Sequence, residues 1–296
     1  MSSLPVLSEI VVLIRGGGDI GSGIAWRLHQ CGFRLIITEI PQPLAVRRKV
    51  SFCEAVYDGI AEIEGIKATL VSSVEKVQSV WDRGEIPLLV DPECKTRSIL
   101  KPQVLVDAVL AKRNLGTAIH DAPLVIAVGP GFEAGKDCHF VVETNRGHHL
   151  GRLLISGSAE PNTGIPGPVM GITEDRVLRA PASGVWNRDL DIGSFVKTRD
   201  RIGNVEGITV EATIAGVIRG LIREGVMVHQ GMKIGDIDPR GRPEYCATIS
   251  EKALAIAGGV LEGILRFTRS SAWKVSSRRR AVPRNDPRDR SGRSDL

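Results

Sequence analysis

The glycine-rich stretch near the start of the chain constrains its fold more than any other feature. An apolar run, Val11–Ile14, leads directly into the pattern G-x-G-x-x-G formed by Gly16, Gly18 and Gly21, and residues 22–30 are patterned as a helix. This strand–turn–helix order is that of dinucleotide-binding βαβ units. There the first glycine permits a sharp turn, the second lets a pyrophosphate approach the backbone, and the third lets the helix pack closely on the strand. The helix N-terminus then faces the anion, so the stretch predicts a nucleotide-phosphate site.

Charged residues beyond the second predicted strand extend this candidate site. Glu39 ends that strand (residues 33–39), 18 residues after Gly21, where an acidic side chain can accept hydrogen bonds from both hydroxyls of an adenosine ribose. An alternative is that Glu39 merely caps the following turn. Arg47 and Arg48 are candidates to bind phosphate, and a solvated helix face is an equally good interpretation of them.

The glycine loop also contains a carboxylate. Asp19 would repel a pyrophosphate unless Arg15 or Arg47 neutralises it. The predicted cofactor-binding set combines the loop with the charged side chains: Gly16, Gly18, Asp19, Ile20, Gly21, Glu39, Arg47 and Arg48.

Strands and helices are expected to alternate over the first half of the chain. Further apolar strands are predicted near residues 68–71, 86–90, 104–107 and 124–128, with helices over 74–81 and 108–113. This order predicts an α/β fold with a Rossmann-like, doubly wound parallel sheet over residues 9–145. Ligands of such sheets bind beyond the carboxyl ends of the strands. Asp91 and Asp107 lie at such ends, and helix capping is the alternative for both, the better one for Asp107.

An internal duplication marks the second half. Residues 180–238 repeat with a shift of 32, so that Ser183-Gly184-Val185 aligns with Ala215-Gly216-Val217. The pattern predicts a β barrel-sandwich hybrid, biotinyl/lipoyl-like, built from two hairpin units over residues 175–268 and including a closing helix over 249–265. Carrier domains hold a lysine at the turn between the halves, whereas residues 205–211 have none. We therefore expect no covalent biotin or lipoate, and a docking or structural role for this domain.

Composition bounds the remaining segments. Residues 146–174 form a Gly/Pro-rich connector, expected to be either a functional loop or a link between domains. Residues 270–296 hold eight basic residues and three aspartates, which accounts for the whole net charge of +5. We expect residues 269–296 to be a disordered basic tail and the neutral folded body not to bind nucleic acid.

Several features favour a cytoplasmic protein. No apolar run approaches the length of a membrane span, and residues 1–9 do not resemble a secretory signal. The five cysteines form no C-x-x-C pair, which favours a reducing compartment. The pairs Cys138-His139 and His148-His149 lack metal-ligand spacing, so no metal site is expected.

Six segments of the chain carry a shared pattern: Arg15–Gly23, Arg47-Arg48 with Phe52–Gly59, Gly129–Phe132, Gly164–Gly167, Val177–Ala182 and Lys233–Arg240. Together they resemble the YqeB-type family, the selenium-dependent molybdenum hydroxylase maturation proteins. The nucleotide-fold half of this family is also similar to chaperones that load molybdenum cofactor into xanthine dehydrogenase-like enzymes. The resemblance implies a cytoplasmic accessory factor whose client is a molybdenum hydroxylase. The glycine loop would then bind NAD(H), another nucleotide or molybdopterin dinucleotide. It implies no catalytic residues.

Two other functions remain open at this point. An NAD-dependent oxidoreductase would need a proton donor near the nicotinamide, for which His120, Asp121 and His139 are candidates without a recognisable motif. A nucleotide-gated, non-catalytic docking module would need only the glycine loop and the β domain.

Overall fold

A nine-stranded sheet forms the core of the first half of the protein. The computed structural model describes residues 6–269. The strand order is β3-β4-β5-β2-β1-β6-β7-β8-β9. The strands are β1 (Val11–Arg15), β2 (Arg34–Glu39), β3 (Ile60–Ile63), β4 (Ile66–Leu70), β5 (Ile86–Val90), β6 (Val104–Asp107), β7 (Leu124–Val128), β8 (Phe140–Val142) and β9 (Leu153–Leu154). Neighbours from β4 to β8 run parallel, whereas β3 and β9 pair antiparallel at the two edges.

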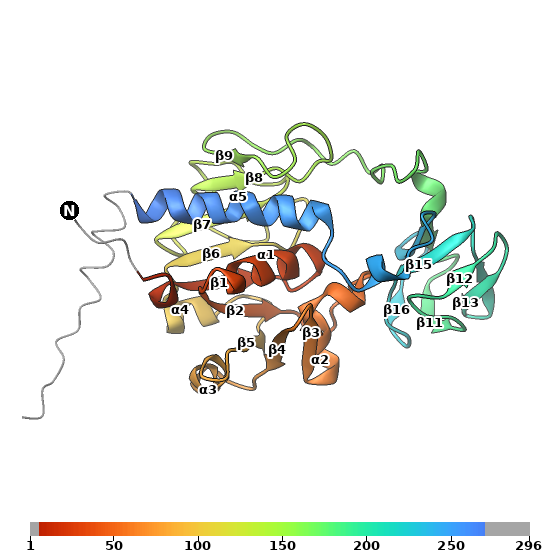
Figure 1. Ribbon diagram of the computed structural model, residues 1–296, viewed down its shortest axis with the longest axis horizontal. Helices are drawn as coiled ribbons and strands as arrows, with labels where there is room; N and C mark the ends of the chain where they lie inside the picture. Colours follow the sequence, from red (N-terminus) through yellow and green to blue (C-terminus); the bar gives the residue numbers. More distant parts are fainter. Residues whose placement is uncertain (1–5, 270–296) are drawn as a thin grey trace, which may run out of the picture.

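Helices cover the two faces of this sheet unequally (Figure 1). The long helices α1 (Asp19–Gln30) and α5 (Glu251–Thr268) share one face, where side chains such as Ile24 and Ile256 pack on Val12 and Ile14. The opposite face packs against short segments only. Those segments are α3 (Val77–Trp81), α4 (Thr96–Leu100) and adjoining loops. The short helix α2 (Ala55–Asp58) precedes β3. Single turns of 3-10 helix span Leu7–Glu9, Arg48–Val50, Phe52–Glu54, Val74–Lys76, Glu174–Arg176 and Pro243–Cys246.

The predicted doubly wound parallel sheet is wrong. The sheet is mixed, with antiparallel strands at both edges. Residues 108–113 form a loop and no helix, so the connection from β6 to β7 does not cover a face of the sheet. Helix α5, from the far end of the chain, shares one face with α1 instead. Helix α5 can lie close beside α1 because Gly23 has no side chain: a Cβ there would lie 2.7 Å from the Cβ of Ala253 in α5. Gly259 of α5 packs against the carbonyl oxygen of Gly151.

Two four-stranded antiparallel sheets form the second half. Their orders are β10-β17-β15-β12 and β14-β13-β11-β16. The strands are β10 (Val177–Arg179), β11 (Gly184–Arg188), β12 (Phe195–Val196), β13 (Arg201–Val205), β14 (Ile208–Glu211), β15 (Gly216–Leu221), β16 (Met227–Val228) and β17 (Lys233–Asp238). Strands β11, β12 and β13 begin 32 residues before β15, β16 and β17, so the sequence repeat is also a structural one.

The predicted barrel-sandwich hybrid of two hairpin units is nevertheless replaced by a different arrangement. Strand β11 pairs with β16, and β12 pairs with β15, so each copy of the repeat contributes strands to both sheets. Strands β10 and β14 extend the edges. The expected closing helix is not part of this unit either, because α5 packs on α1 and on the large sheet (Figure 1). The buried apolar residues of α5 belong to the core of the large sheet, and the core around Trp186 contains none of them.

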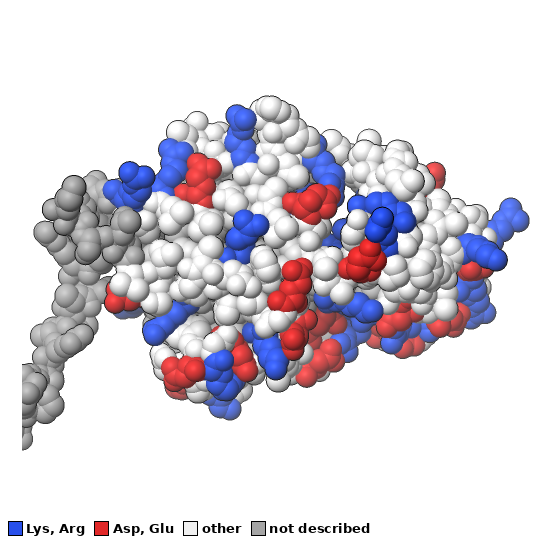
Figure 2. All heavy atoms as spheres, in the orientation of Figure 1, with Lys and Arg blue, Asp and Glu red and all other residues white. Residues whose placement is uncertain are grey.

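The surface of the described residues mixes both signs of charge. In Figure 2, basic and acidic side chains alternate over the visible face. Within residues 6–269, none of the helices is long and apolar enough to cross a bilayer. The predicted basic tail, residues 269–296, lies outside the described residues from position 270 onward.

Candidate functional site

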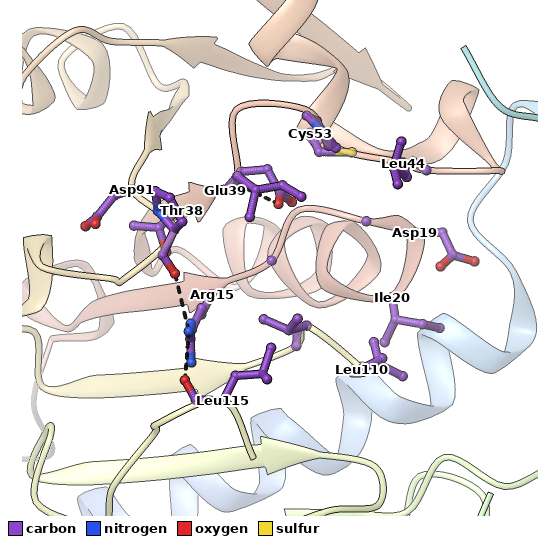
Figure 3. A pocket seen from close by; sticks show the side chains of 18 residues that line it. Arg15, Asp19, Ile20, Thr38, Glu39, Leu44, Cys53, Asp91, Leu110 and Leu115 are labelled. Carbon is purple, nitrogen blue, oxygen red and sulfur yellow. Dashed lines mark hydrogen bonds between the residues drawn. The ribbon is translucent and has the colours of Figure 1, made fainter. Parts of the chain in front are cut away.

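A cavity of about 320 Å³ lies at the carboxyl ends of the central parallel strands. The loop from β1 to α1 provides Gly16, Gly18 and Ile20, and β2 provides Glu39; residues that follow β5 and β6 complete the wall (Figure 3). The strands position these residues because β1 lies between β2 and β6 with every neighbouring pair parallel. The volume of this cavity is in the range of small-molecule sites.

The three glycines of the fingerprint occupy distinct environments. Gly16 has φ of +97°, a conformation that favours glycine, and a Cβ there would lie 3.0 Å from the carbonyl oxygen of Ala108. Gly18 has open space where its Cβ would stand, and it faces the cavity. A Cβ at Gly21 would overlap the carbonyl oxygen of Gly16. A tight turn, an open approach and a close contact between helix and loop are thus present in the order that dinucleotide binding requires.

Glu39 fastens the glycine loop to the end of β2. Its Oε2 accepts a hydrogen bond from the backbone N–H of Gly17 at 2.8 Å, and its Oε1 accepts one from Ile40 at 2.8 Å. Burial raises the pKa of this carboxyl group, and the two backbone hydrogen bonds oppose the rise. A carboxylate oxygen can accept more than one hydrogen bond. Glu39 therefore holds the loop and still presents acceptors to a ligand in the cavity.

Arg15 holds the opposite wall of the cavity. Its guanidinium donates to Oδ2 of Asp107 at 3.4 Å and to the Thr117 hydroxyl at 3.1 Å. It also donates to the carbonyl oxygens of Pro92 at 3.3 Å and Leu115 at 3.2 Å, as Figure 3 illustrates for Leu115. Arg15 thus ties the end of β1 to the segments after β5 and β6, and its donors are committed within the protein.

Asp19 and Ile20 occupy different positions at the start of α1. The side chain of Ile20 lies beside Leu110 on the cavity wall, whereas the carboxylate of Asp19 points away from Glu39 and Arg15 (Figure 3). Asp19 is within electrostatic range of Arg47. The repulsion expected between Asp19 and a bound pyrophosphate is therefore reduced by the orientation of its side chain and by a neighbouring cation.

Arg47 and Arg48 do not line this cavity, contrary to expectation. Arg47 is buried and donates to the carbonyl oxygens of Tyr245 and Thr248, each at 3.0 Å. Arg48 donates to the carbonyl oxygen of Leu221 at 2.7 Å and to Asp191 at 2.6 Å. The backbone turns away from the sheet here because the carbonyl oxygen of Val46 accepts a hydrogen bond from the N–H of Leu221 in β15. These arginines join the large sheet to the small ones.

The candidate proton donors lie elsewhere as well. His139 precedes β8 at the amino edge of the sheet, where its Nδ1 accepts a hydrogen bond from the N–H of Val125 at 3.0 Å. His120 is exposed, and Asp121 pairs with Arg97 at 3.1 Å; neither lines the cavity. Asp91 lines the cavity and caps α4, since it accepts hydrogen bonds from the backbone N–H groups of residues 95 and 96.

Two parts of the wall of the 320 Å³ cavity are not predicted from the sequence. Cys53 follows β2 by a long loop, and its backbone N–H donates to the carbonyl oxygen of Gly17 at 2.9 Å. Burial, followed by the nearby carboxylates of Glu39 and Glu54, raises the pKa of the Cys53 thiol well above its usual value. The helix predicted over residues 108–113 is absent, and residues 108–115 form a loop that closes one side of the cavity. The signal for Cys53 was its place in the segment 52–59 that carried the family resemblance.

Among residues 6–269, no group of three or more His, Cys, Asp or Glu side chains could hold a metal ion.

The chain is a homologue of an uncharacterised bacterial protein. It is 48% identical to YqeB of Escherichia coli (strain K12) over 255 residues, which is 86% of this chain and 47% of YqeB. The chain thus spans about half the length of the curated relative it matches. No protein-family model matches it.

Solved structures offer only distant likenesses. The ectoine utilization protein EutE (DoeB) from Ruegeria pomeroyi is 12% identical with a TM-score of 0.22, covering 77% of this chain and 57% of that one. An aspartoacylase family protein from Mesorhizobium loti is 14% identical with a TM-score of 0.26, covering 79% and 86%. A succinylglutamate desuccinylase/aspartoacylase from Rhodobacter sphaeroides is 13% identical with a TM-score of 0.26, covering 77% and 84%. Similarity at this level assigns no activity.

Proposed function

We propose that this chain, a relative of YqeB over most of its length, is a cytoplasmic accessory factor that binds a nucleotide-bearing ligand in the maturation of a selenium-dependent molybdenum hydroxylase. The ligand is NAD(H), another nucleotide or molybdopterin dinucleotide. The client is a xanthine dehydrogenase-like enzyme. The maturation role rests on the family resemblance, whereas the nucleotide site rests on the geometry of the glycine loop.

The open position at Gly18 is the observation that carries the nucleotide part. No atom lies within 4 Å of the place where a Cβ would stand, and this space belongs to the cavity. Backbone N–H groups at the start of α1 have no partner within the helix, and the positive end of the helix dipole lies there. A pyrophosphate fits this arrangement, because it needs close backbone approach and N–H donors.

Glu39 supplies the second contact expected of a nucleotide site. Its carboxylate lines the same cavity as Gly18, on the strand next to the glycine loop. A ribose placed between them would donate its hydroxyl hydrogens to Glu39 while the phosphate lies over Gly18. The proposal therefore assigns the loop to phosphate and Glu39 to the sugar.

An oxidoreductase is less well supported than a binding protein. Neither His120, Asp121 nor His139 reaches the cavity, so none can exchange a proton with a ligand there. A docking role for the β domain remains compatible with the accessory function.

Calorimetric titration with AMP, NAD and molybdopterin dinucleotide tests the binding step. Gly18→Val should abolish binding and leave the fold intact, because the valine side chain enters free space and Gly18 has a φ of −66° that any residue adopts. Gly258→Val is the matched control, since Gly258 also has open space around its Cβ position and lies on α5, away from the cavity. Absence of binding by the wild-type protein to all three ligands would refute the nucleotide site.

The maturation step needs a separate measurement. A xanthine dehydrogenase-like hydroxylase is purified from cells that produce the wild-type protein or the Gly18→Val variant, and its molybdenum and selenium contents are measured. We expect the client from the variant cells to be depleted in one of the two elements. Equal contents in both preparations would contradict the maturation role even if nucleotide binds.

A further inference from the structure

A second, larger cavity adjoins the first along the same edge of the large sheet. It has a volume of about 470 Å³ and lies at the carboxyl ends of β7 and β8. Its walls come from the turn 144–146 after β8, the connector residues 160–168 and Lys252 near the start of α5. Leu110 lines both cavities, so the two cavities are neighbours on either side of this residue.

The loop between the two cavities has an unusual backbone. Leu110 and Lys112 have φ of +56° and +62°, in the left-handed region that non-glycine residues seldom adopt. Such conformations persist where the surrounding structure enforces them, and they are enriched at ligand sites. Gly131 packs closely against this loop, because a Cβ there would lie 2.6 Å from the Cα of Arg113. The loop between the cavities is therefore supported by the turn after β7.

Glu143 does not line the second cavity but holds the backbone of residues that do. This side chain is buried at the end of β8, and its Oε1 accepts hydrogen bonds from the N–H groups of Thr144 and Asn145, both at 2.6 Å. Its Oε2 accepts a hydrogen bond from the N–H of Glu160 at 2.7 Å. Glu143 thus fastens the connector to the sheet, as Glu39 fastens the glycine loop. Figure 1 shows the connector leaving the large sheet near β9 and running to the small ones.

Positive charge predominates in the second cavity. Lys112, Arg146 and Lys252 line it against one carboxylate, Glu160. Arg146 pairs with Glu251 at 2.6 Å, and Glu160 accepts a hydrogen bond from the side chain of Asn145. The charge of Arg146 is thus compensated within the protein, whereas the hydrogen bond of Glu160 comes from a neutral amide.

Lys252 is the partly buried lysine of this cavity, whereas Lys112 is exposed. Within residues 6–269 its ammonium group has neither a hydrogen-bond nor an ion-pair partner, although it is only partly exposed. Burial and then the charge of Arg146 lower the pKa of Lys252, while Asp19, Glu143 and Glu251 act in the opposite sense. Leaving a desolvated cation without a partner costs free energy that a bound anion would recover.

We propose that the second cavity binds the phosphate- or carboxylate-bearing half of a two-part ligand, with Lys252 as its principal contact. The other half is the nucleotide in the first cavity, so this inference rests on the function proposed above. Leu110, Pro130 and Ile165 supply an apolar wall suited to a ring or hydrocarbon portion next to the acid group.

Calorimetry with AMP present in saturating amount isolates the second cavity. Inorganic phosphate and acetate are titrated separately, so the two acid groups are distinguished. We expect the wild-type protein to bind at least one of them, and Lys252→Met to weaken that binding about tenfold or more while leaving the AMP affinity unchanged. Lys252→Arg should restore most of the affinity. Lys67→Met, at an exposed lysine of the β3–β4 hairpin, is the matched control and should bind as the wild type does.

The outcomes separate the two proposals. Binding of phosphate or acetate that is unaffected by Lys252→Met, or no binding of either by the wild type, overturns the second-cavity assignment. If AMP does not bind but anion binding still depends on Lys252, the nucleotide proposal and the two-part ligand are both wrong, and the cavity is a separate anion site. Loss of AMP affinity in Lys252→Met would also contradict the assignment, because Lys252 does not line the first cavity.

Discussion

Replacement of Glu39 separates its two expected tasks, which are holding the glycine loop and contacting a ribose. In Glu39→Ala the N–H of Gly17 loses the acceptor that it reaches at 2.8 Å in a partly buried place. The N–H of Ile40 loses its acceptor too, but Ile40 is exposed and water can replace the carboxylate. One unsatisfied buried donor costs about 1–3 kcal/mol. The free energy of unfolding should fall by that amount.

Glu39→Gln should behave differently. The carboxamide oxygen can still accept the hydrogen bond from Gly17, and a neutral group avoids the desolvation that raises the pKa of Glu39. Because the raised pKa means that the folded protein favours the protonated form, the contribution of Glu39 to the free energy of unfolding should decline as the pH rises through the region just above 4.5. The glutamine variant lacks this decline, so its free energy of unfolding near neutral pH should stay within about 1 kcal/mol of the wild-type value.

Urea denaturation and calorimetry together test this reasoning. The wild-type protein should bind AMP more tightly than 2′,3′-dideoxy-AMP, and Glu39→Gln should reduce the difference between the two ligands. Unchanged stability of Glu39→Ala would show that the carboxylate does not support the loop. Equal affinity of the wild-type protein for both ligands would show that Glu39 does not contact the ribose.

Three further predictions concern the loop, the junction between the sheets and the amino edge of the large sheet. Gly21→Ala places a methyl group against the carbonyl oxygen of Gly16 and should lower the free energy of unfolding by about 1–3 kcal/mol or more in urea denaturation, with AMP binding lost. Arg47→Met leaves two carbonyl oxygens without donors and should cost about 2–3 kcal/mol, while calorimetry should show unchanged AMP affinity because Arg47 does not line the cavity. Burial lowers the pKa of His139, so below about pH 6.5 the unfolded chain binds a proton that the folded chain excludes, and wild-type stability should fall as the pH decreases. His139→Asn should show a flatter dependence in urea denaturation at a series of pH values, and an equally steep one would contradict this account of His139.

The family resemblance found in the sequence is confirmed in its coarser form. The homology with YqeB covers most of the chain, whereas the link to a molybdenum hydroxylase stays a proposal. The sequence also located most of the strands, because fully buried parallel strands such as β7 leave continuous apolar runs.

Charged side chains were the least predictable part of the site. Glu39 ends β2, and Arg47 and Arg48 follow that strand, yet of the three only Glu39 lines the cavity. The arginines act at the junction with the small sheets because Val46 pairs with β15, a contact between segments more than 170 residues apart. No local pattern encodes such a contact.

Local backbone geometry is what the sequence determined by itself. Three patterns can be read directly along the chain: the apolar run before the loop, the spacing of Gly16, Gly18 and Gly21, and the 32-residue repeat. They specified the loop and the strand positions correctly. Tertiary structure alone decided that α5 covers the large sheet and that the repeats exchange strands between two sheets. It also decided that Lys252 lies beside the turn after β8. These outcomes depend on which apolar faces and charges meet after folding, and that competition among distant segments is not visible in any one of them.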